Sequence, residues 1–214
     1  MSQIKRIPEG NSYGYTTLAI EEQDPPLDQL CEELKNYKSL SNVSVKKNAF
    51  KEIDVFQHLP NLLLLDVSEN KIKSVEWLDQ NPGCLAYLTS INLANNEIRE
   101  LTNFPQHRLM RVNLNDNKIL NCDRFDGSMN KIKFLNLERN KLKSISWCHD
   151  MPNLEELSVA ENSITSLEGM HDLDCLRVLN VRANKISSLD GTPELKCETL
   201  VLDENAIGEE DGAK

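Results

Sequence analysis

The chain has 214 residues, of which 39% are hydrophobic, enough apolar surface for a folded core. Its 24 Lys and Arg against 34 Asp and Glu give a formal net charge of −10, which opposes the counterion release that drives nucleic-acid binding. No local cluster of Lys and Arg in the sequence offsets this charge, so we expect neither nucleic acid nor a membrane as the main ligand.

The first residues contain no apolar run of the kind found in signal peptides. Nowhere do about 18 apolar residues stand in a row, as a membrane-spanning helix requires. The six cysteines are widely separated and form no CxxC pair. We therefore expect a cytoplasmic protein whose cysteines are reduced and behave as small hydrophobic side chains.

The first predicted elements are an N-terminal arm, residues 1–14, and an N-terminal capping unit, residues 15–39. A degenerate strand around Leu18 precedes Gln23, which stands where each later unit has an asparagine. Asp24-Pro25-Pro26 is typical of a helix start. A helix is expected after it, because four apolar residues follow at helical spacing: Leu27, Leu30, Cys31 and Leu34.

From residue 40 to residue 207 the frame L-x-x-L-x-L-x-x-N-x-I recurs in eight units. Apolar positions two apart place their side chains on one face of a short strand, and successive strands stack into a parallel sheet. The asparagine closes the turn and bonds backbone groups that would otherwise be buried without partners. An acidic tail, residues 208–214, follows the last unit. The asparagines are Asn48, Asn70, Asn96, Asn117, Asn140, Asn162, Asn184 and Asn205.

The unit between Asn70 and Asn96 is stretched. Pro-Gly indicates a turn, so we expect a surface loop at residues 80–83 that leaves the strand at residues 88–93 in register. Trp77 and Trp147 both stand seven residues after an asparagine. Either each ring packs over its own convex loop, or both mark a convex contact surface.

The units resemble the 22-residue intracellular class of leucine-rich repeats, with residues 166–173 as the clearest convex segment. The resemblance covers about residues 40–207 and implies an α/β leucine-rich-repeat solenoid. Such a solenoid has a curved parallel β-sheet on the concave face and short helical or irregular segments on the convex face. The class includes regulatory subunits of protein phosphatases and ciliary proteins of the radial spoke, which act by binding protein surfaces. Residues 62–70 and 107–114 look most like the radial-spoke type.

Side chains six, four and two positions before each asparagine are expected on the concave face, where such solenoids usually bind. The apolar ones need a cover or belong to a hot spot around Phe134, although scattered exposed apolar residues are also normal. The asparagines among them either contact a partner or simply suit a crowded, curved face. The candidate partner-binding residues are Leu64, Asp66, Arg111, Asn113, Phe134, Asn136, Glu156, Val178, Asn180 and Arg182.

A second candidate surface is the C-terminal edge of the sheet, at Leu200, Val201 and Leu202. A strand with a neighbour on one side only exposes backbone groups and half-covered apolar side chains. A frayed last repeat is the alternative. The mixed charges around the concave arginines either contact a partner or pair with one another; they are Arg111, Arg139, Arg182, Glu138, Glu156 and Glu161.

The sequence offers no catalytic motif, and we expect no catalytic residue, cofactor or metal. His149-Asp150 and His171-Asp172 occupy the same register one unit apart, which could place zinc ligands together, but duplication in a repeat favours a structural reason. Residues 123–127 resemble a calcium loop without its alternating acids and are predicted to be a turn.

These observations predict a non-catalytic adaptor or scaffold that binds protein partners within a larger cytoplasmic assembly. The class resemblance favours the ciliary axoneme as its location. The alternative is a soluble regulatory subunit that docks on an enzyme such as a protein phosphatase. An enzyme would need a cluster of titrating residues that the sequence does not supply.

Overall fold

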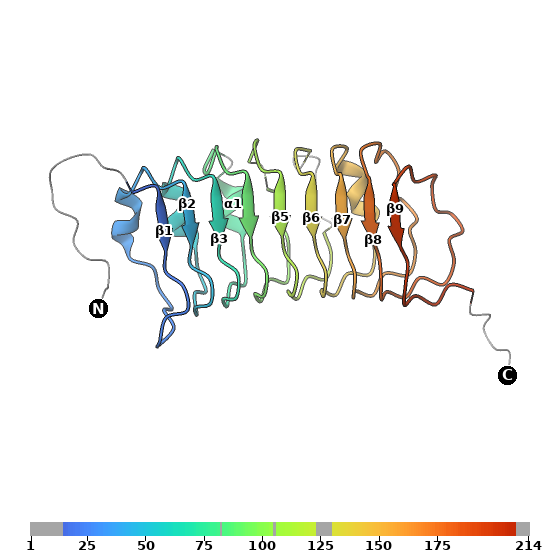
Figure 1. Cartoon of the computed structure of the whole chain (residues 1–214), viewed down its shortest axis with the longest axis horizontal. Helices are drawn as coiled ribbons and strands as arrows, with labels where there is room; N and C mark the ends of the chain where they lie inside the picture. Colours follow the sequence, from blue (N-terminus) through green and yellow to red (C-terminus); the bar gives the residue numbers. More distant parts are fainter. Residues whose placement is uncertain (1–14, 82, 105, 123–129, 209–214) are drawn as a thin grey trace.

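The computed structural model describes residues 15–81, 83–104, 106–122 and 130–208. Within them, nine strands of three residues form one parallel sheet in chain order, so that each strand pairs only with its sequence neighbours (Figure 1). The sheet runs along the long axis of the molecule, with β1 at one end and β9 at the other. The strands are β1 (Thr17–Ala19), β2 (Asn42–Ser44), β3 (Leu64–Asp66), β4 (Ser90–Asn92), β5 (Arg111–Asn113), β6 (Phe134–Asn136), β7 (Glu156–Ser158), β8 (Val178–Asn180) and β9 (Thr199–Val201).

The alternation of each strand separates a core face from an open face. In β6 the central residue Leu135 is buried, whereas Phe134 and Asn136 on either side of it face outward. The register pairs Leu135 with Leu157 of the next strand, so that the buried residues stack in a continuous row. The predicted strand register is confirmed, and the core lies between the sheet and the convex segments.

The asparagines join each repeat to the one before it. The Asn96 Nδ2 donates to the carbonyl oxygens of Leu93 and Ala94 at 3.0 and 3.1 Å in its own turn, and to Val67 O of the preceding repeat at 3.1 Å. The Asn96 Oδ1 accepts the Ile72 N–H at 3.0 Å. One side chain therefore satisfies four backbone groups, most of them buried.

The residue before each asparagine has a positive φ, between 48° and 58° in the eight units. This left-handed position reverses the chain direction after the strand. It is occupied by Lys47, Glu69, Asn95, Asp116, Arg139, Glu161, Ala183 and Glu204. Because none of these is glycine, the sequence gives little sign of this conformation.

The convex side carries short helical segments, as predicted. They are the 3-10 helices η1 (Glu32–Asn36), η2 (Asp54–His58) and η3 (Ser146–Asp150), and the α-helix α1 (Glu76–Gln80). Irregular backbone joins them to the turns that follow the asparagines.

The helix expected from residue 24 onward is wrong over most of its length, since only η1 forms. Leu27 is exposed, and its backbone groups form hydrogen bonds with the turn of the first repeat. Its N–H donates to the Asn48 Oδ1 at 3.1 Å, and its carbonyl oxygen accepts the Ala49 N–H at 2.7 Å. These bonds hold the segment against the neighbouring turn, where it cannot form helical bonds to itself.

The stretched unit keeps the sheet in register, because Leu64 pairs with Ser90 as expected. Its extra residues follow α1, with Asn81 exposed and open space around Gly83. Residue 82 and the predicted turn at residues 123–127 lie outside the described residues, as do residues 1–14 and most of the acidic tail.

The register predicts opposite outcomes for two adjacent alanine substitutions. Leu135→Ala should lower the free energy of unfolding by about 2 to 5 kcal/mol, because it leaves a cavity in the core. Phe134→Ala should cost about 1 kcal/mol or less, since its ring lies on the open face. Urea unfolding followed by circular dichroism measures both, and equal losses would contradict the assigned faces.

Candidate protein-binding surfaces

The candidate concave residues all lie on the open face of the sheet, in columns set by the strand pairing. The residues six before each asparagine form one column, and those four before it form the next. Leu64 is 48% exposed, whereas Phe134 and Val178 are half-buried. Phe134 lies three strands from Leu64 and two from Val178, which is about 14 and 10 Å at the usual strand spacing. The three apolar side chains therefore form separate contact points instead of one cluster.

The Phe134 ring is covered by an arginine from the neighbouring strand. The Arg111 Cζ lies 4.2 Å from the centroid of the ring, and the two residues are direct partners in the β5–β6 pairing. Among the described residues Arg111 makes no ion pair. The pair thus presents an aromatic ring and an unneutralised guanidinium together at the middle of the open face.

The concave asparagines have a structural role that the sequence did not reveal. The Oδ1 atoms of Asn113 and Asn136 accept the backbone N–H two residues later, at 3.2 and 3.0 Å. Asn92 and Asn180 do the same, and the Asn180 Nδ2 also donates to Glu138 at 3.4 Å. Each oxygen is therefore used within its own turn.

Of the six residues in the mixed-charge region, only Arg139 and Glu161 pair with each other among the described residues, and the other ion pairs there use partners outside the set. Arg139 makes two bonds to Asp116, at 2.6 and 2.8 Å, and contacts Glu161 at 3.4 Å. The bonds to Asp116 raise the pKa of Arg139. Arg182 pairs with Glu204. Such exposed pairs contribute at most about 1 kcal/mol each.

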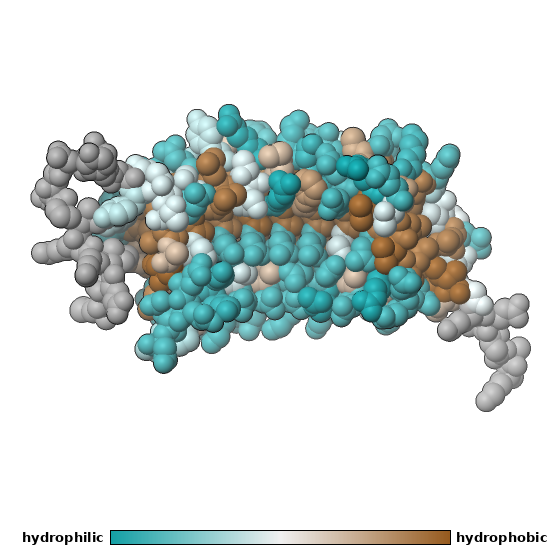
Figure 2. Space-filling model, viewed as in Figure 1, coloured by the Kyte–Doolittle hydropathy of each residue, from teal (hydrophilic) through white to brown (hydrophobic). Residues whose placement is uncertain are grey.

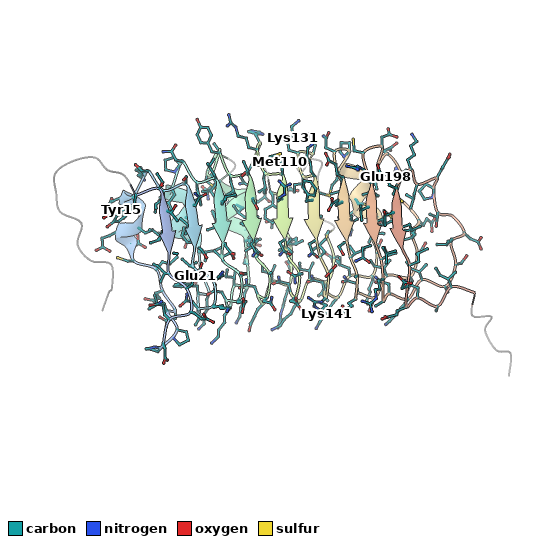
Figure 3. The ribbon with its side chains drawn as sticks, viewed as in Figure 1. Tyr15, Glu21, Met110, Lys131, Lys141 and Glu198 are labelled. Atoms are coloured by element: carbon teal, nitrogen blue, oxygen red, sulfur yellow. The ribbon has the colours of Figure 1, made fainter. Side chains whose placement is uncertain are left out.

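The edge below the strands carries a row of cations that the linear sequence conceals. We call it the basic row; its members are Lys71, Lys73, Arg99, Lys118, Lys141, Lys143 and Lys185. The expectation that no basic cluster offsets the net charge is wrong for this edge, because the repeat brings together residues of neighbouring repeats that are about 20 positions or more apart in the sequence. Figure 3 labels Lys141 on this edge and Lys131 on the opposite one.

The convex side carries the two His-Asp pairs that the sequence offered as possible zinc ligands. The rings of His149 and His171 are adjacent, with centroids 5.3 Å apart. In the described part of the chain, no group of three or more potential ligands could hold a metal ion. The Trp147 Nε1 donates to Ser144 O at 3.0 Å, so this ring packs over its own loop. Burial raises the pKa of the Cys148 thiol to about 12, which makes it a poor nucleophile.

The β9 end of the sheet exposes apolar side chains, which gather there in Figure 2. Leu200 is 38% exposed, and Val201 and Leu202 are half-buried. Val181 N–H donates to Val201 O at 3.0 Å. Leu202 occupies the equivalent position one repeat later, and its N–H has no partner within the described residues.

Comparisons with known proteins agree on the repeat. Residues 152–197 match the family model of Leucine Rich repeats (2 copies). Toll-like receptor 2 type-2 of Gallus gallus is 30% identical over 122 residues, a match that covers 55% of this chain and 15% of the receptor. The chain thus spans a small part of this relative.

Two solved structures show the same architecture. Internalin C2 of Listeria monocytogenes superposes with a TM-score of 0.67 at 18% identity, over 91% of this chain and 76% of that one. A chain of the Toll–Spatzle complex of Drosophila superposes with a TM-score of 0.70 at 21% identity, over 88% and 26%.

With the nine parallel strands, these matches define the fold as a curved leucine-rich-repeat solenoid. The 22-residue class and the ciliary type are narrower assignments than this fold, and the matches do not reach them. No helix of the described residues is long and apolar enough to span a membrane.

The β9 end predicts a contrast in amide exchange. In the isolated protein, the Leu202 amide should exchange about 100-fold or more faster than the amide of Val181, which is hydrogen-bonded to the next strand. Hydrogen exchange followed by NMR measures both, with Val159 as an interior control because its N–H donates to Asn180 O at 2.9 Å. Equal protection of Leu202 and Val181 would contradict an open edge.

Proposed function

We propose that this chain is a non-catalytic adaptor that binds another protein through its concave face, with Arg111 and Phe134 at the centre. The observation that carries the proposal is the half-buried Phe134 ring beneath an arginine that makes no ion pair among the described residues. Aromatic side chains and arginine dominate the energetics of protein interfaces, particularly near the centre of the contact.

The surroundings of this pair support the same function. Leu64 on one side and Val178 on the other give a partner further apolar contacts along the same column. Glu156, Asp66 and Arg182 place charges around these apolar residues. Such charges orient an approaching partner more than they add to its affinity. An open sheet face of this kind suits a protein surface better than a small substrate, which needs an enclosed pocket that excludes water.

Two further parts of the proposal concern the ends of the repeat array. Residues 15–39 act as the cap of the solenoid, supported by the pairing of β1 with β2 and the burial of Leu34. Leu200, Val201 and Leu202 form a second contact surface, supported by their exposure beside the Leu202 N–H, which has no partner within the described residues.

The test of the concave site compares two apolar truncations. Phe134→Ala should weaken binding of the physiological partner by about tenfold or more, which corresponds to about 1.4 kcal/mol. Leu120→Ala is the matched control, because Leu120 is 52% exposed and stands three residues after its asparagine, away from the strand columns. The partner is first identified by affinity isolation of the native protein, and its Kd is then measured for each purified variant.

Unchanged affinity of Phe134→Ala, or an equal loss in Leu120→Ala, would refute the concave site. Circular dichroism melting of each variant shows whether it remains folded. Arg111→Gln is a second test variant. It removes the positive charge over the Phe134 ring and should also weaken binding of the partner.

The proposed assembly is the ciliary axoneme, and the support is the resemblance of residues 62–70 and 107–114 to leucine-rich-repeat proteins of the radial spoke. The protein should then remain with demembranated axonemes and leave them only in high salt. A regulatory subunit that docks reversibly on an enzyme such as a phosphatase should instead enter the detergent-soluble fraction. Fractionation of ciliated cells with immunoblotting separates the two, and complete release by detergent would contradict the axonemal location.

A further inference from the structure

The basic row follows from how the backbone leaves each asparagine turn. The second residue after the asparagine is fully buried, as Ile72, Ile119 and Leu142 show. Because the chain is extended there, the first and third residues point away from the core. Those two positions carry Lys71 and Lys73 in one repeat and Lys141 and Lys143 in another, and all four are exposed.

Backbone bonds hold the members of the row at regular intervals. The N–H of the first residue after the asparagine donates to the carbonyl oxygen of the second residue in the preceding repeat. Lys118 N–H bonds Ile98 O at 2.8 Å and Lys141 N–H bonds Ile119 O at 2.9 Å. Lys185 N–H bonds Ile164 O at 2.8 Å. These bonds between neighbouring repeats therefore fix the backbone positions from which the three lysine side chains start.

Most cations of the row have no anionic partner. Among the described residues, Lys71, Lys73, Arg99, Lys141, Lys143 and Lys185 form no ion pair, and only Lys118 contacts a carboxylate, Glu97 at 3.7 Å. Two cations on the opposite edge of the sheet do form ion pairs. Lys133 pairs with Glu155 at 2.6 Å and Arg177 with Glu198 at 3.0 Å. The basic row therefore holds six cations without an ion pair among the described residues, while on the opposite edge Lys131 is likewise unpaired.

We propose that the basic row is a docking surface for an acidic, extended polypeptide segment of a partner protein. Five strand spacings separate Lys71 from Lys185, or about 24 Å. An extended chain covers that distance with about seven residues. A short run of Asp and Glu therefore matches the row in length as well as in charge.

The rest of the molecule favours a peptide over larger polyanions. The chain carries a net charge of −10, and screening extends over only about 8 Å at physiological salt. A short acidic segment stays within reach of the row. A membrane or a nucleic-acid helix covers more surface and meets acidic neighbours such as Glu69 and Glu100. This surface is separate from the concave site at Phe134.

The experiment measures binding of a fluorescent peptide with about eight consecutive glutamates by anisotropy, with the glutamine version of the peptide as the probe control. The row variant carries Lys71→Gln, Lys73→Gln, Lys141→Gln and Lys143→Gln. The matched control variant removes the same charge from exposed lysines elsewhere and carries Lys35→Gln, Lys38→Gln, Lys131→Gln and Lys196→Gln.

Wild type and Phe134→Ala should bind the glutamate peptide equally, and binding should weaken as salt rises from about 0.05 to 0.3 M. The row variant should lose about tenfold or more in affinity and the control variant less than about threefold. Arginine in place of the four row lysines should restore binding. Equal losses in both variants, or no saturable binding by wild type, would overturn the proposal. So would tighter binding of anionic vesicles or of single-stranded RNA than of the peptide.

Discussion

The fold depends on the asparagine that follows each strand from β2 to β9, six of which are buried. Its amide bonds carbonyl groups in its own turn and in the preceding repeat, and its oxygen accepts a backbone N–H from that repeat, as at Asn117. A polar group buried without partners would destabilise the core, so the side chain has one acceptable position. Neighbouring repeats are consequently locked in one register.

That register determines the surfaces of the molecule. Because equivalent residues stand one strand apart, each position of the repeat becomes a column along the solenoid. A column whose charged residues pair across neighbouring repeats carries little net charge, as with Lys133 and Glu155. A column whose residues do not pair becomes a continuous charged or apolar feature. A residue type that recurs at one position of the repeat thereby becomes a continuous surface that a partner can bind.

The concave face shows how structure and binding share the same side chains. Asn113 and Asn136 use their oxygens to bond the following turn, which leaves their amide nitrogens on the open face. Phe134 lies outside the core but is partly covered by Arg111. The Phe134 ring and the Arg111 guanidinium both remain accessible to a partner. The strongest support for protein binding therefore comes from a pair whose members belong to neighbouring strands.

The sequence alone determined the strands, their faces and the asparagine turns, because alternation and a repeated asparagine are local patterns. It failed at residues 27–31, where bonds between Leu27 and the turn at Asn48 replace the helix that apolar spacing predicted. It also missed the function of the concave asparagine oxygens, the cover of Phe134 by Arg111, and the basic row. Each of these depends on which residues of neighbouring repeats come together, and only the packing of one repeat against the next decides that.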